Sequence, residues 1–333
     1  MFILQKKKEM TKIMNNFHDI YFNLLESHMN YEFYNKPRNQ AQFERIMTSF
    51  ELTNPIERVV YSKERKINIT FQFAEFLWYM SGSNSLDFVK YYASNMIKYS
   101  ADGKTLTGTA YGPKIFRKLS NGKTQIETLV ELLKVQPETK RAVLQIFDAD
   151  ELSDINSIDV SCTLCLQFLI RNGKLNCIGF MRANDMYVGM SSDVFSFTMI
   201  QEYVANLLNI PVGTYYHVVG SSHLYEVNFN KAKEVLENRQ NFESYKLNFP
   251  QMPSENLEKN LAAVLSFEKQ LRLNEISLTN DEINNLSLPN YWKDVVRLFE
   301  LKREKTYETT VDDNIVNSLD DCIKYLYLNK FGE

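Results

Sequence analysis

Residues 161–185 read SCTLCLQFLIRNGKLNCIGFMRAND, and this stretch decides how the middle of the chain folds. Two apolar runs, 162–170 and 175–182, are rich in residues that favour β-strands. They are joined by Asn172-Gly173, a dipeptide typical of tight hairpin turns. Further strands are predicted at 141–147 and 215–219, and the mixed segment 50–62 is expected to pair as strands. The middle of the chain therefore predicts a sheet.

Helical spacing of apolar residues surrounds this sheet on both sides in the sequence. It predicts helices within the first 30 residues from Ile13 to Leu25, at 71–80, at 124–135 before Pro137, and at 194–208. From about residue 255 onward the text is rich in Leu, Glu, Lys and Asn with helical spacing. We therefore expect an α/β (α+β) body at 1–255, with a large mixed sheet flanked by helices, and a mostly helical C-terminal extension at 256–333.

Composition limits the classes of protein to consider. The chain has 333 residues, 44% of them hydrophobic, and a formal net charge of −3, so no basic field favours a nucleic-acid polymer. No run of 18 apolar residues predicts a membrane span, and the first ten residues are too short in apolar text for a secretion signal. We expect a cytoplasmic protein with free thiols. Cys162-x-x-Cys165 has no second ligand pair at metal-site spacing, so no metal is expected.

Several residues around the hairpin could carry chemistry, although each has a plainer interpretation. Cys162 opens a strand after a polar loop, where a free cysteine is more often a small buried hydrophobe than a nucleophile. Arg182 ends the neighbouring strand and could stabilise a thiolate. Asp193 precedes an apolar helix and could simply cap it. His223 and Tyr225, two apart in an extended segment, should face one side.

In combination these motifs resemble the thymidylate synthase family. The resemblance runs from SCTLCLQF at 161–168 through Gly173-Lys-Leu and Arg182-Ala-Asn-Asp185 to Asp193, and His223-Leu-Tyr225 follows at the family's spacing. Upstream, similar text is found at Arg38, Glu75-Phe-Leu-Trp78, Gly108-Thr-Ala-Tyr111-Gly112 and Lys140-Arg141. The resemblance covers roughly residues 30–230 and implies the fold of that family, in which one face of the sheet forms a homodimer.

The resemblance also implies roles for these residues. Cys162 would add to C6 of a pyrimidine nucleotide, which makes C5 nucleophilic toward the methylene of 5,10-methylenetetrahydrofolate. The other implied catalytic residues are Glu75 for waters and protons, Asp185 for the folate, and Tyr111. The phosphate would be bound by Arg38 and Arg182, with Lys140 and Arg141 from the partner subunit. His223 and Tyr225 would hold the sugar.

The departures from the family pattern point to a different base and product. Asp193 stands where thymidylate synthases have an asparagine that reads uracil, and aspartate there resembles the family's cytidylate hydroxymethylases. A carboxylate accepts from the cytosine amino group, and a shared proton can satisfy N3. Thr163 replaces a histidine, and the region 97–100 lacks tryptophans that would shield an exocyclic methylene from water. Ala183 and Lys140 replace a serine and an arginine, which favours CMP slightly over dCMP.

Three alternatives stay open on the sequence. The chain could methylate dUMP in the manner of a thymidylate synthase, with Asp193 tolerated. It could be a family member that binds a nucleotide or RNA without turnover, although Cys162, Arg182 and Asp185 together argue against this. Residues 256–333 could also form an interaction module. Because no text matches the family's closing C-terminal segment, closure over a folate is in doubt.

Overall fold

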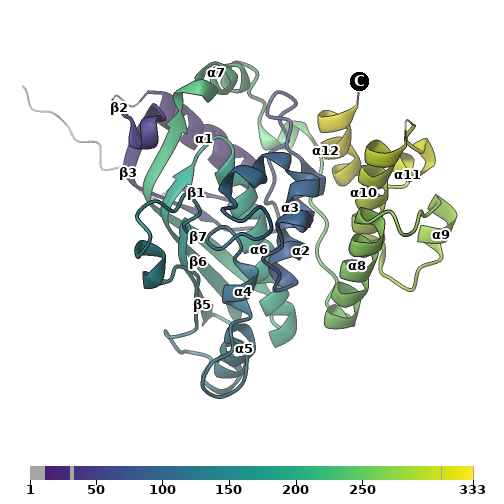
Figure 1. The fold of residues 1–333 in the computed structure, drawn as a ribbon, viewed down its shortest axis with the longest axis horizontal. Coiled ribbons are helices and arrows are strands. Elements are labelled where there is room, and N and C mark those ends of the chain that lie inside the picture. The colour runs from purple at the N-terminus through teal and green to yellow at the C-terminus, as the bar shows by residue number, and fades with distance from the viewer. Residues whose placement is uncertain (1–11, 31–33, 309, 333) are drawn as a thin grey trace, which may run out of the picture.

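The computed structural model describes residues 12–30, 34–308 and 310–332, and a mixed sheet forms its body (Figure 1). The strand order is β1-β3-β7-β6-β5-β4, and β2 pairs with β3. These strands are β1 (Lys12–Met14), β2 (Tyr34–Asn35), β3 (Gln42–Leu52), β4 (Val143–Gln145), β5 (Thr163–Arg171), β6 (Lys174–Asp185) and β7 (Val212–Tyr225). Strands β6 and β7 run parallel, whereas β3 with β7 and β5 with β6 are antiparallel.

The central hairpin forms as predicted from Asn172-Gly173. Both residues have positive φ, 51° and 71°, which matches a type I′ turn between strands β5 and β6. The two strands then pair from Arg171 with Lys174 as far as Thr163 with Met181, across a bulge between Thr163 and Cys165. The hairpin register therefore places Cys162 beside the far end of β6.

Helices cover one face of this sheet (Figure 1). The long helix α6 (Gly189–Leu208) lies on β6 and β7, and α2 (Ile69–Met80) packs on α6. Eleven of the twelve α2 residues are buried, in agreement with the helix predicted at 71–80. The other helices of the body are α1 (Phe17–Met29), α3 (Leu86–Tyr92), α4 (Gly112–Ile115), α5 (Gln125–Val135) and α7 (Phe229–Glu237).

The C-terminal helices form a further layer outside α2 (Figure 1). They are α8 (Leu257–Arg272), α9 (Asn280–Asn284), α10 (Asn290–Tyr307), α11 (Asp313–Asn317) and α12 (Asp321–Phe331), of which α10 and α12 contact α2. The segment before α8 is anchored to the body at a buried ion pair. Glu202 binds Arg58 at 2.6 Å and also accepts from the Met252 amide at 2.7 Å. The helical text after 255 is thus helical in the structure, while its status as a separate domain stays a prediction.

Several predicted boundaries were wrong. The segment 50–62 is not strand beyond Leu52: Pro55 cannot donate to a ladder, and Arg58 turns inward to Glu202. Ile13 belongs to strand β1 and not to the first helix, which begins at Phe17. Strand β4 is shorter than 141–147, and β7 is longer than 215–219.

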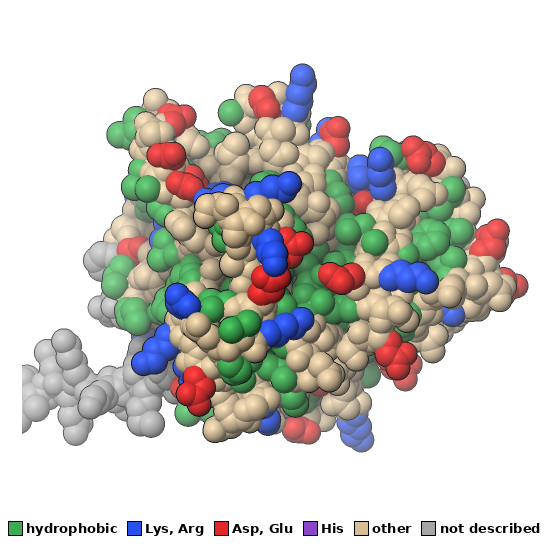
Figure 2. All heavy atoms as spheres, turned by 90° about the horizontal axis from the view of Figure 1, so that it is seen from below, with side chains coloured by type: hydrophobic (Ala, Val, Ile, Leu, Met, Phe, Trp, Pro, Cys, Tyr) green, Lys and Arg blue, Asp and Glu red, His purple; other side chains and the backbone are tan. Residues whose placement is uncertain are grey.

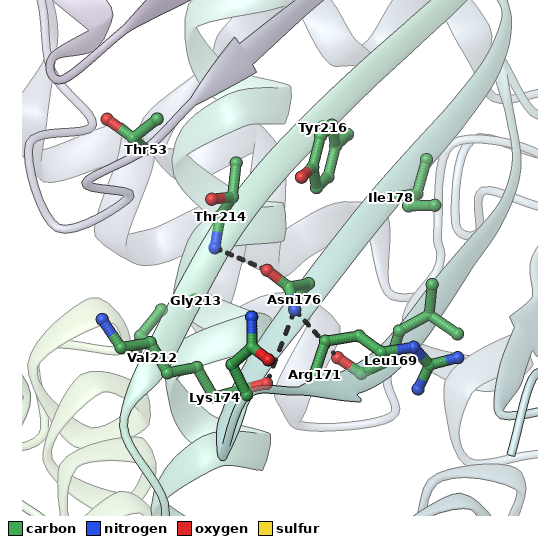
Figure 3. Close-up of a pocket in the computed structure, with 11 residues that line it drawn as sticks. Thr53, Leu169, Arg171, Lys174, Asn176, Ile178, Val212, Gly213, Thr214 and Tyr216 are labelled. Carbon is green, nitrogen blue, oxygen red and sulfur yellow. Dashed lines mark hydrogen bonds between the residues drawn. The ribbon is translucent and has the colours of Figure 1, made fainter. Parts of the chain in front are cut away.

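The second face of the sheet carries partly exposed side chains. It holds a cavity of about 500 Å³ whose lining includes Arg171, Lys174, Asn176, Thr214 and Tyr216, near the Asn172-Gly173 turn (Figure 3). On the face of the molecule seen in Figure 2, acidic and basic side chains are interspersed. Among the described residues, no helix is long and apolar enough to cross a membrane.

Candidate active site

Strand register gathers the predicted residues at one end of the sheet. The Arg182 amide donates to the Cys162 carbonyl at 2.8 Å, so these two residues lie side by side across β5 and β6. On the other side of β6, Asp185 is paired with His223 of the parallel strand β7. Three strands therefore bring a thiol, a guanidinium, a carboxylate and an imidazole to a single edge.

The Cys162 thiol lies between opposing electrostatic influences. Burial raises its pKa, Arg182 and Arg38 lower it, and Asp193 and Asp159 raise it. The nearest Arg182 nitrogen is 3.9 Å from the sulfur. Because the thiolate is the reactive form, Arg182 is placed to promote it, whereas the surrounding acids and burial oppose it until a ligand arrives.

Two arginines near Cys162 form no ion pair with a carboxylate among the described residues. Arg182 donates to the carbonyls of Ser161 at 2.8 Å and Val160 at 3.0 Å. Arg38 reaches the carbonyls of Ser157 and Ile158, both at 3.4 Å, from a left-handed backbone position with φ 50°. A strained, exposed arginine facing a second unpaired arginine suits the binding of an anion such as a phosphate.

Asp159 fixes the loop that precedes Tyr111 through hydrogen bonds. Its carboxylate accepts from the amides of Thr107, Gly108 and Thr109 at 2.7, 3.0 and 2.7 Å. A Cβ on Gly108 would lie 2.3 Å from the Asp159 carbonyl oxygen, so only glycine fits there. The loop leads directly to Tyr111, whose hydroxyl accepts from Thr163 at 3.0 Å. Tyr111 is thereby fixed next to the residue that follows Cys162.

Glu75 is a buried carboxyl without a cation to balance it. It accepts from the Ser196 hydroxyl at 3.2 Å, and Tyr79 contributes a second hydrogen bond. Burial, reinforced by the negative charge of Asp193, raises the pKa of Glu75 to about 8. A carboxyl that holds its proton near neutral pH can both give and take protons, as a general acid or base must.

Asp193 is not a helix cap, because α6 begins four residues earlier at Gly189 with Val188 at the cap position. Its side chain is partly buried and accepts from the Asn184 amide nitrogen at 2.7 Å. Burial and the neighbouring Asp185 raise the pKa of Asp193 to about 7, against the opposing effect of Asn184. The alternative interpretation as a cap is therefore wrong, and Asp193 presents a proton-sharing carboxyl near Cys162.

His223 and Tyr225 face one side of their strand, as expected for extended backbone. Their rings lie 4.8 Å apart, and Nδ1 of buried His223 has no hydrogen-bond partner in the described structure. Burial lowers the pKa of His223 and raises that of Asp185, while the attraction between them opposes both shifts. Asp185 also accepts from the Tyr187 amide at 2.9 Å, which fixes the carboxylate at the end of β6. An unpaired ring nitrogen here is available to a ligand hydroxyl.

Lys140 and Arg141 lie away from this cluster. Both are exposed before β4, and Arg141 binds Gln136 at 3.0 Å. The β4–β5 register places them beyond Gln167, roughly 20 Å along the strand from Cys162. Ala183 does lie in the cluster, next to Ser221 of β7. Within one chain the structure thus unites the predicted residues except Lys140 and Arg141.

Sequence reasoning missed four residues of the site. Tyr79 lies one helical turn after Glu75 and stacks on Tyr111 with ring centroids 4.9 Å apart. Ser196 lies three residues after Asp193 on α6, so the spacing of the two residues alone could have found it. Asn184 and His217 are buried polar residues, and no local pattern distinguished them from structural ones.

Comparison with known proteins defines the class of this chain. A sequence model of the family described as thymidylate synthase matches residues 17–280. The chain belongs to the thymidylate synthase family. The fold is also similar to thermostable thymidylate synthase A from Bacillus subtilis, with a TM-score of 0.57 and 21% identity over 68% of this chain and 86% of that one.

The chain is also similar to individual curated members of this family. The chain is 32% identical over 200 residues to a deoxyuridylate hydroxymethyltransferase of Bacillus phage SP01, covering 57% of this chain and 52% of the relative. It is 33% identical over 180 residues to the protein of that name from Pseudomonas phage M6, covering 53% and 50%. The chain thus spans about half the length of the curated relatives it matches.

The donor set at the site is that of an organic substrate site. In the described part of the chain, no three His, Cys, Asp or Glu side chains gather in a way that could hold a metal ion. The polar groups instead comprise a thiol, two unpaired arginines and three carboxyls, at one sheet edge. Such a set can bind a phosphate, read a base and move protons around a nucleophile.

Proposed function

We propose that the chain hydroxymethylates C5 of a cytidine monophosphate, with 5,10-methylenetetrahydrofolate as the one-carbon donor. Family membership supports nucleophilic one-carbon transfer to a pyrimidine nucleotide, and the names of its relatives support a hydroxymethyl product. The single observation that carries the choice of base is Asp193, which offers a carboxyl where cytosine presents an amino donor and a ring-nitrogen acceptor.

The proposed reaction balances without an oxidant. The Cys162 thiolate adds to C6, and C5 forms a bond to the methylene carbon of the folate. C5 then loses its proton, and the bond between that methylene carbon and the folate nitrogen breaks, which releases tetrahydrofolate. Water adds to the resulting exocyclic methylene, and Cys162 leaves, so that the products are the 5-hydroxymethyl nucleotide and tetrahydrofolate. Glu75, with its pKa raised to about 8, would move the protons at C5 and the base edge.

The remaining residues would orient the nucleotide and the folate. Arg38 and Arg182 would hold the phosphate, since neither has a carboxylate partner of its own in the described structure. His223 and Tyr225 would bind the sugar, and Asp185 would hold the folate ring at the end of β6. Ala183 lacks a hydroxyl that could donate to the phosphate, and on this change, together with Lys140 in place of an arginine, rests the slight lean to CMP over dCMP.

A second subunit would complete the phosphate site. The exposed positions of Lys140 and Arg141, distant from their own Cys162, support a role across a homodimer formed by the open face of the sheet. Mixing Cys162→Ala protein with Arg141→Ala protein should restore activity, because half of the sites in a mixed dimer would be intact. Persistent inactivity of the mixture would contradict this arrangement.

The decisive experiment offers CMP, dCMP, UMP and dUMP with methylenetetrahydrofolate and weighs the products by mass spectrometry. We expect a hydroxymethyl group on the cytosine nucleotides, and a reaction confined to uracil nucleotides would overturn the proposal. A uracil substrate is the second candidate, because the relatives are named for deoxyuridylate. Formation of dihydrofolate with dUMP would instead indicate methylation.

A further inference from the structure

A series of hydrogen bonds between buried side chains connects the core of the sheet to Asp193. The Tyr215 hydroxyl lies 2.7 Å from Nδ1 of His217, whose Nε2 lies 3.0 Å from the side-chain oxygen of Asn184. The Asn184 nitrogen then donates to Oδ2 of Asp193 at 2.7 Å. Asn184 is 3% exposed and His217 fully buried, so water does not replace these contacts. None of the first three residues has a role in the reaction described above.

The direction of every hydrogen bond in this series follows from the chemistry of His217. Burial lowers the pKa of His217 to about 3, so the ring is neutral and carries one N–H. The carbonyl oxygen of Asn184 can only accept, so the proton lies on Nε2 and Nδ1 accepts from the Tyr215 hydroxyl. The amide of Asn184 is thereby held with its oxygen toward His217 and its N–H groups toward Asp193.

The opposite direction leaves a buried proton without an acceptor. It would require the Tyr215 hydroxyl to accept from Nδ1 and to direct its own proton elsewhere, but the described structure gives this hydroxyl no second partner. The hydroxyl also lies against β6, where a Cβ on Gly179 would approach it to 2.6 Å. An unsatisfied buried donor of this kind is destabilising, so this direction is disfavoured.

We propose that Asn184, oriented by His217 and Tyr215, makes the base-reading carboxyl of Asp193 selective for cytosine over uracil. This inference rests on the proposed function and names the residue that sets its specificity. Because Oδ2 accepts from Asn184, a proton on Asp193 resides on Oδ1. The carboxyl then offers one donor and one acceptor, the complement of the cytosine N3 and amino group.

Uracil requires the reverse arrangement. Its N3–H needs an acceptor and its O4 needs a donor, so Oδ2 would have to carry the proton. A hydroxyl oxygen of a carboxylic acid is a weaker acceptor than its carbonyl oxygen, so a proton on Oδ2 would weaken the hydrogen bond that Oδ2 accepts from Asn184. Asn184 is therefore a positioning residue, which acts on the base through Asp193.

Asn184→Asp tests the inference with a side chain of the same shape. The change keeps an acceptor for His217 but replaces the donor, so a proton is shared at Oδ2 and leaves Oδ1 free to accept from uracil. We expect the ratio of kcat/KM for CMP over UMP to fall by about tenfold or more, the size of one base-reading contact. Asn260→Asp is the matched control: Asn260 is also buried, donates to the Glu255 carbonyl at 2.9 Å and lies in α8.

A second variant separates orientation from damage to the fold. Tyr215→Phe leaves Asn184 and Asp193 intact but removes the hydroxyl that fixes the tautomer, so the ratio should fall in the same direction by about threefold. A purely structural role would lower kcat/KM for both nucleotides equally. Unchanged ratios in both variants would overturn the inference, provided that the unaltered protein turns over CMP. If the unaltered protein does not use cytosine nucleotides, the proposed function itself fails.

Discussion

Buried acids in the active site and in the C-terminal helices differ in their hydrogen-bond partners. In the helices, Glu300 binds Arg303 at 2.6 Å and Glu268 binds Arg272 at 2.7 Å, so each carboxylate has a guanidinium partner. At the site, the donors to Glu75 and Asp193 in the described part of the chain are neutral: Ser196 and Tyr79 for Glu75, and Asn184 for Asp193. Burial therefore raises their pKa values to about 8 and about 7.

This contrast distinguishes acids kept for structure from acids kept for chemistry. The guanidinium partner of Glu300 and that of Glu268 each lie in the same helix as the acid, where they offset part of the cost of burying its charge. An unpaired buried carboxyl costs stability and gains a proton that it can exchange. Glu75 and Asp193, which have no guanidinium partner among the described residues, both belong to the cluster around Cys162.

The largest effect should follow from neutralising Glu75. Glu75→Gln keeps the shape and the hydrogen bond from Ser196 but removes the exchangeable proton, so turnover should fall by about 10² to 10⁴-fold. Single-turnover assays with the preferred nucleotide would measure it. The matched control is Glu300→Gln in α10, which should leave turnover within about twofold, since it contacts no part of the site. Equal losses in both variants would remove the distinction.

The buried ion pair between Arg58 and Glu202 should contribute strongly to the stability of the fold. Glu202→Gln leaves Arg58 buried and unpaired and weakens the bond to the Met252 amide, which should lower the free energy of unfolding by about 3–5 kcal/mol. Urea unfolding followed by circular dichroism would show it. A loss below about 1 kcal/mol would mean that the buried pair contributes no more than an exposed one.

A smaller loss of stability is expected where the arginine left behind has other hydrogen-bond partners. Glu300→Gln breaks the ion pair with Arg303, but this arginine also binds Glu308 at 2.6 Å and Asn274 at 3.0 Å. The free energy of unfolding should therefore fall by about 2 kcal/mol, less than for Glu202→Gln. If both variants lost the same stability, the neighbours of Arg303 would contribute nothing.

The smallest effect is a change in the pH dependence of stability. The folded pKa of Glu75 is raised from 4.5 to about 8, so the folded state keeps a proton that the unfolded chain has released. Between these values stability falls as pH rises, and it levels off above the folded pKa. Glu75→Gln should therefore gain stability relative to the unaltered protein as the pH rises from 5 to 9. A constant difference in urea unfolding would contradict the raised pKa.

Much of the fold was predictable because local signals agreed with the tertiary structure. The Asn172-Gly173 turn fixed the hairpin, and apolar spacing located α2 and α5. The prediction of strands at 50–62 was wrong because Arg58 is buried in an ion pair with Glu202. These residues lie 144 positions apart, so no local pattern reveals the contact. Helix α6 begins at Gly189 and not at the predicted residue 194, because a glycine gives no local signal for the start of a helix.

The sequence by itself determined the residue types of the site: the Cys162 thiol, the arginines at 38 and 182, and the carboxyls at 75, 185 and 193. It also determined the hairpin that carries the thiol, since turn geometry is a local property. Only the tertiary structure decided that Glu75 and Asp193 have no counterion among the described residues, and that Asn184, His217 and Tyr215 are linked by hydrogen bonds. Burial and distance set pKa values and proton positions, and both arise from contacts between segments far apart in the sequence.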